Sequence, residues 1–186
     1  MKTAVKRLLD RDFCFFTFAA LGALCGALPP LLFSRSPEAE ALAGGFAHAF
    51  PADFSPKQLA LAIFFQALPM LVIYYSGFGV LVRESSAAVI FIRAFFAGYC
   101  TVLASELGDL KDPLFLLLLL FFILFELLTV SFHASFAHLA RAFSRGILKK
   151  RSKKAIRSFT ADLLFFYGLI LFFYIARGFA VALMNL

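Results

Sequence analysis

Long apolar runs alternate with short polar segments along the whole chain. Each run holds about 20 residues or slightly more, which at 1.5 Å per residue matches the hydrocarbon thickness of a bilayer. The predicted membrane spans are residues 13–33, 58–82, 87–105, 114–134 and 159–183. The pattern therefore predicts an all-α integral membrane protein with five transmembrane helices, which form one helical membrane domain over residues 1–186.

The clearest span is followed by the most basic segment of the chain. The run DPLFLLLLLFFILFELLTVSF begins with Asp112, and after that residue it contains a single carboxylate, Glu126. Downstream, RGILKKRSKKAIR carries seven Lys or Arg among thirteen residues and no acid. Because basic segments stay on the cytoplasmic side of a membrane, this end of the fourth span is predicted to be cytoplasmic.

The remaining charges agree with that orientation. With the N-terminus inside, the cytoplasmic segments 1–12, 83–86 and 135–158 hold 13 Lys and Arg, whereas the outer connections hold three. The positive-inside bias predicts a multi-pass cell-membrane protein with a cytoplasmic N-terminus and an external C-terminus. The longest polar connection, 34–56, is then external, and its piece EAEALAGGFAHAF suits a short interfacial helix.

Proline and glycine suggest where the helices bend and end. Pro69 is predicted to bend the second span, and the segment from Gly77 to Gly79 is predicted to mark a break near its end. Residues 83–86 are predicted to form a short turn. Pro113 suits the first turn of the fourth helix, which is expected to continue beyond the span until Gly146 interrupts it. The sequence leaves open whether Pro69 and Gly77 form a hinge.

The first span carries a small-residue step. Gly22 and Gly26 are four residues apart and would lie on one helix face, where they allow another helix to approach closely. The pattern does not identify that helix. Pro29 and Pro30 are expected to kink or end the first span near its far side.

Composition excludes several classes of protein. The chain is 62% hydrophobic and only 16% charged, which is outside the usual range of soluble domains. The net charge of +7 does not indicate nucleic-acid binding, because the positive charge flanks membrane spans. The three cysteines lie in apolar runs without a metal-site spacing, and no catalytic constellation is evident, so we expect neither an enzyme nor a metal or other cofactor.

Two charged residues lie deep in neighbouring spans. Arg93 in the third span and Glu126 in the fourth are at similar depth, and a lone charge there costs several kcal/mol. We therefore predict an Arg93–Glu126 ion pair. The pair is interpreted first as a structural clamp between two helices, with a proton, ion or polar-substrate path as the alternative. Arg177 is expected to snorkel to the outer surface, where Glu106 or Asp109 would meet it.

The basic segment is a candidate binding surface. Its main interpretation is attachment to anionic lipid at the cytoplasmic face. The alternatives are an acidic cytoplasmic protein partner and, less favoured, nucleic acid. Its members are Arg145, Lys149, Lys150, Arg151, Lys153, Lys154 and Arg157.

The layout resembles the stage II sporulation protein M family over most of the chain. The features are the glycine step of the first span, the polar outer loop, the segments FFQALPMLVIYYSGFGVLV and FIRAFFAGY, and FEL around Glu126. Many members carry Pro-His-Gly followed three residues later by Glu. Glu126 matches that Glu, whereas residues 121–123 are Phe-Phe-Ile in place of Pro-His-Gly.

The resemblance implies a membrane scaffold that acts during engulfment in endospore formation and is not itself catalytic. It would localise and anchor peptidoglycan-degrading partners, the sporulation proteins D and P, through the outer loop 34–56 in the septal or engulfing membrane. The main alternative is a small transporter or permease subunit that uses Arg93 and Glu126. A membrane-embedded enzyme is less favoured, and the sequence leaves open whether the chain forms a homo-oligomer.

Overall fold

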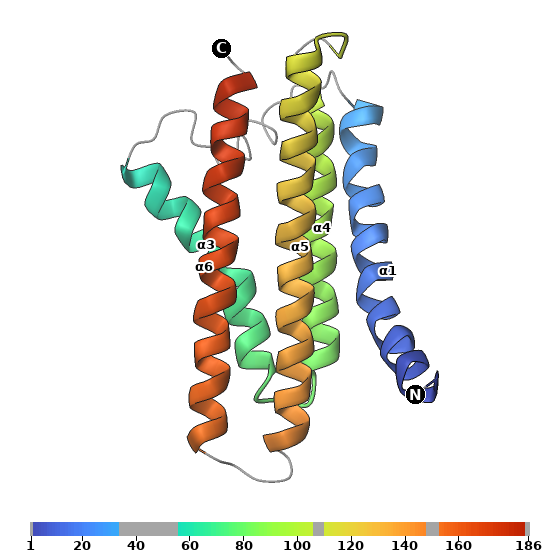
Figure 1. Cartoon of the computed structure of the whole chain (residues 1–186), viewed down its shortest axis with the longest axis vertical. Coiled ribbons are helices and arrows are strands. Elements are labelled where there is room, and N and C mark those ends of the chain that lie inside the picture. The colour runs from blue at the N-terminus through green and yellow to red at the C-terminus, as the bar shows by residue number, and fades with distance from the viewer. Residues whose placement is uncertain (1, 34–55, 106–109, 148–152, 185–186) are drawn as a thin grey trace.

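The structure is a computed structural model that describes residues 2–33, 56–105, 110–147 and 153–184. The described residues form an all-helical bundle (Figure 1). Its helices are α1 (Lys2–Phe33), α3 (Pro56–Ser76), α4 (Val82–Ser105), α5 (Pro113–Ile147) and α6 (Lys153–Met184). The interfacial helix predicted within the connection 34–56 lies outside the described residues.

Successive helices run in alternating directions, so the two chain ends lie at opposite ends of the bundle (Figure 1). The start of α1, the α3–α4 turn, the end of α5 and the start of α6 share one end. These are the segments that the sequence places together on the cytoplasmic side.

Among the described residues, four helices are long and apolar enough to cross a membrane. The stretches are Phe15–Leu32 in α1, Val82–Val102 in α4, Pro113–Gly146 in α5 and Lys153–Ala180 in α6. Within the described residues, α3, the predicted second span, does not add a fifth such stretch. It is the shortest of the described helices and contains Pro69, and its course in Figure 1 is bent, as expected where proline interrupts the helical hydrogen-bond ladder.

Several predicted boundaries shift. The second predicted span ends at Ser76 rather than at residue 82, and the turn occupies 77–81. The segment 83–86, predicted as a turn, belongs to the first turns of α4. Two glycines near Ser76 favour the earlier break, while Glu84 suits the N-terminal end of the α4 dipole.

Other boundary predictions are confirmed. Pro113 is the first residue of α5, and the Asp112 carboxylate accepts a hydrogen bond from the backbone N–H of Leu114 at 3.0 Å. The predicted continuation of this helix beyond the span is also confirmed, but Gly146 does not interrupt α5, which extends to Ile147. Pro29 and Pro30 likewise do not end α1, which continues to Phe33.

The partner of the glycine step is α4. A Cβ atom added to Gly22 or Gly26 would collide with the backbone carbonyl of Phe91 or Phe95, respectively. Gly98 of α4 is similarly close to the Ala23 carbonyl of α1. The two backbones therefore touch through small residues on both helices, which confirms the predicted close packing.

An aromatic cluster joins α3, α5 and α6 near the α3–α4 turn. The Phe159 ring stacks on Phe143 with centroids 4.2 Å apart, on Tyr74 at 5.0 Å and on Phe136 at 5.3 Å. The Ser144 hydroxyl donates a hydrogen bond to the Gly79 carbonyl at 2.9 Å. These contacts fix the α3–α4 turn against the end of α5.

Candidate functional site

Polar side chains gather between α4, α5 and α6 in the middle of the bundle. We call the set of Arg93, Glu126, His133, Tyr174 and Arg177 the charged centre. All but Arg93 are buried, and Arg93 is partly buried. Such groups are costly within a bilayer and are commonly functional or paired, which makes this centre the candidate site.

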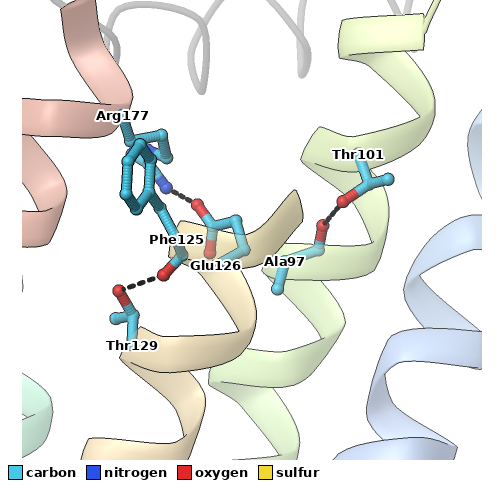
Figure 2. A network of polar contacts seen from close by, with 6 residues as sticks. All are labelled: Ala97, Thr101, Phe125, Glu126, Thr129 and Arg177. Carbon is cyan, nitrogen blue, oxygen red and sulfur yellow. Dashed lines mark hydrogen bonds and ion pairs between the residues drawn. The ribbon is translucent and has the colours of Figure 1, made fainter. Parts of the chain in front are cut away.

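Glu126 of α5 forms an ion pair with Arg177 of α6, as Figure 2 shows. Both side chains are almost completely buried. The Arg177 guanidinium also lies 4.8 Å from the Tyr174 ring centroid and 5.7 Å from that of Phe122. The cation is thus held by one carboxylate and two aromatic rings, and these contacts join α5 to α6.

This geometry corrects the prediction for Glu126. Its carboxylate is paired with Arg177 and not with Arg93. The matched depth of Arg93 and Glu126 follows from counting residues along antiparallel helices, but depth does not specify the direction in which each side chain points. Depth alone therefore gave the wrong partner.

The prediction for Arg177 was also wrong. Arg177 was expected to reach outward to the membrane surface, yet it is buried. Ile170, Tyr174 and Arg177 follow one another at four and three residues, which places all three on the buried face of α6. The acids proposed for its outer partner, Glu106 and Asp109, lie outside the described residues.

Arg93 lies near the midpoint of α4, about 17 Å along the helix from each end. Among the described residues it forms neither an ion pair nor a hydrogen bond, and its Nε atom is enclosed without a partner. It is close enough to Arg177, Tyr174 and His133 to interact with them electrostatically. Arg93 thus belongs to the charged centre without a carboxylate of its own.

A line of polar residues continues along α5 from Glu126. The Thr129 hydroxyl donates to the Phe125 carbonyl at 2.8 Å, and the Thr129 carbonyl accepts from His133 Nδ1 at 2.8 Å. Because a carbonyl oxygen only accepts, His133 carries its proton on Nδ1. Its Nε2 atom is buried without a hydrogen-bond partner. Figure 2 also shows the matching bond on α4, in which the Thr101 hydroxyl donates to the Ala97 carbonyl.

The described members of the basic segment lie on the surface. Arg145 is exposed in the last turn of α5, and Lys153, Lys154 and Arg157 are exposed on the first turns of α6. The other members, at 149–151, lie outside the described residues. The described part of this segment is therefore free of the bundle core and accessible to a membrane surface.

Sequence reasoning missed Arg177, His133 and Tyr174 as members of the site. A usable signal was present, because Glu126 and His133 are seven residues apart, as are Arg93 and Cys100. Seven residues are about two helical turns, so each pair lies along one face. Within the described residues, no group of three or more His, Cys, Asp and Glu is placed to hold a metal ion.

The centre can hold helices together, stabilise a buried negative charge or carry polar solutes. No family model matches the chain, and no curated protein or solved structure matches it either. The chain is thus defined by its architecture as a helical, multi-pass membrane protein with a charged centre.

Proposed function

We propose that this protein is a non-catalytic membrane scaffold that anchors peptidoglycan-degrading partners during engulfment in endospore formation. In this proposal the chain crosses the cell membrane five times, with α3 as the second crossing, a cytoplasmic N-terminus and an external C-terminus. The partners bind at the external side, where the connection 34–56 would lie.

The observation that carries the proposal is the interlocked packing of the bundle. Gly22 and Gly26 of α1 touch the α4 backbone, and the Glu126–Arg177 pair joins α5 to α6. A scaffold needs a fixed spacing between its external segments, which such packing supplies. The resemblance to the stage II sporulation protein M family adds the identity of the proposed partners.

The proposal is tested by cross-linking in sporulating cells of an endospore-forming bacterium that express the chain. Captured complexes are separated on a gel containing purified peptidoglycan, so that a hydrolase reveals itself by clearing the gel. The control replaces residues 35–54 with a Gly/Ser segment of equal length. Clearing with the native chain and none with the control supports the scaffold. Equal clearing, or none in either case, contradicts it.

A second candidate is a small transporter or permease subunit. It is favoured by one observation: Arg93 lies within electrostatic range of His133 and of Arg177, which is itself paired with Glu126 inside the bundle. Polar groups at this depth are typical of ion and solute paths. Solute flux into proteoliposomes that depends on Glu126, and is lost in Glu126→Gln with the fold intact, would favour this function over the scaffold.

A further inference from the structure

The charges of the centre do not balance around Arg93. Of the chain's 18 Lys and Arg, only Arg93 and Arg177 lie well inside the predicted spans, and Glu126 is the only acid near the middle of a span. That carboxylate is engaged by Arg177. Asp162 of α6 is about 22 Å along the helix from Arg177. Arg93 therefore needs another counter-charge.

The surroundings of Arg93 favour an anion. The guanidinium is close enough to that of Arg177 for the two to repel each other. His133, also within electrostatic range, is enclosed and donates its Nδ1 proton to a backbone carbonyl, so it supplies no negative charge to Arg93. Two neighbouring cations around one carboxylate leave one net positive charge in a region of low polarity, where an ion pair is the usual compensation.

We propose that the charged centre binds one small monovalent anion, held by Arg93 on the side of α4 that faces α6. Planar guanidinium groups favour carboxylates and other oxyanions, and also attract halides. The site is about 17 Å from either end of α4, which is deeper than lipid phosphate groups. A free anion is therefore favoured over the phosphodiester of a lipid. Binding is a property of the chain itself and does not depend on the scaffold proposal.

The test uses the purified full chain in a maltoside detergent, which contains no phosphate. Thermal unfolding is followed in sodium chloride, sodium formate and sodium gluconate at equal ionic strength, and uptake of radiolabelled chloride and formate is measured directly. Gluconate is the bulky anion that a narrow site excludes. We expect chloride or formate to raise the Tm by about 5 °C over gluconate, since a ligand that binds only the folded state stabilises it.

Variants locate the site. Arg93→Gln should lower the affinity for the labelled anion by about tenfold or more, because the charge-assisted contact is lost. Arg93→Lys should retain weaker binding, and Arg83→Gln, at an exposed position of the same helix, should bind as the native chain does. If Arg93→Gln does not fold, the proposal is tested by titrating the labelled anion into the native chain and into Arg93→Lys and comparing their affinities.

The proposal is overturned by a native Tm that is the same in all three salts with no labelled anion bound. Equal anion binding by Arg93→Gln and the native chain also overturns it. Phospholipid that stays bound through delipidation in the native chain, but not in Arg93→Gln, would assign the counter-charge to a lipid phosphate and would likewise contradict a free anion.

Discussion

Glu126 on α5 and Arg177 on α6 form an ion pair in the interior of the helix bundle. The pair joins two helices that run in opposite directions and are connected only at their far, basic end (Figure 1). Because Arg177 also lies over the Tyr174 ring, the contact combines charge and aromatic packing. Inside a membrane, apolar side chains alone pack almost equally well in several rotations of a helix about its axis. The ion pair therefore fixes how α5 and α6 are aligned and which faces they turn toward each other.

The α1–α4 contact predicts that even one added methyl group is harmful. Gly26→Ala should destabilise the fold by about 1–3 kcal/mol, because the new Cβ would overlap the Phe95 carbonyl and force the helices apart. Gly168→Ala is the matched control, since nothing lies within 4 Å of the added Cβ. Reversible unfolding in mixed micelles measures both variants, and equal stability of the two would refute the close contact.

The aromatic cluster predicts a strong position dependence for Phe→Ala changes within α6. Phe159→Ala should cost roughly 2–4 kcal/mol, since it removes stacking on Phe143, Tyr74 and Phe136 and leaves a cavity. Phe165→Ala, on the exposed side of the same helix, should cost less than about 1 kcal/mol because lipid replaces the lost contacts. The same unfolding measurement applies, and similar losses for the two variants would argue against the cluster.

The orientation predicts which ends of the bundle are accessible from outside the cell. In a chain whose native cysteines are replaced, Leu110→Cys should react with a membrane-impermeant thiol reagent in intact cells, whereas Lys154→Cys should react only after lysis. Both positions are exposed and lie at opposite ends of the bundle. The opposite labelling pattern would show that the chain has the orientation opposite to the one predicted from the charge bias.

The basic end of the bundle predicts selective retention of anionic lipid. Replacing Lys153, Lys154 and Arg157 together with Gln should reduce the anionic lipid that native mass spectrometry finds on the chain, because each basic residue contributes about 1 kcal/mol near a charged surface. Lys111→Gln, at the other end, is the control. Unchanged lipid retention in the triple variant would contradict lipid binding by the basic segment and would favour an acidic protein partner.

Much of the architecture could be predicted from hydrophobicity alone. A bilayer requires long apolar helices, so the apolar runs locate the helices along the chain. The charge bias then predicts on which side of the membrane each helix begins and ends. The boundaries near Ser76 and Val82 were missed, since apolar residues continue across 77–81 and conceal the turn.

The charged centre was predictable only in part. Residue counting places Arg93 and Glu126 at similar depth, but pairing depends on which face of each helix points inward. For α6 that face is apparent only when Tyr174 and Arg177 are seen packed against α5. Likewise, Gly22 and Gly26 predict a close contact without naming α4, because the matching residue, Gly98, is a single glycine among many apolar positions.

The most direct test of the charged centre is a double-mutant cycle on Glu126 and Arg177, with folding stability measured in mixed micelles. Glu126→Gln and Arg177→Gln should each destabilise the fold by about 3 kcal/mol, since each leaves a buried charge without its partner. The double variant should be more stable than the sum of the single losses predicts, with a coupling energy of about 1–3 kcal/mol. Additive losses would show that the two side chains act independently and would contradict the paired centre.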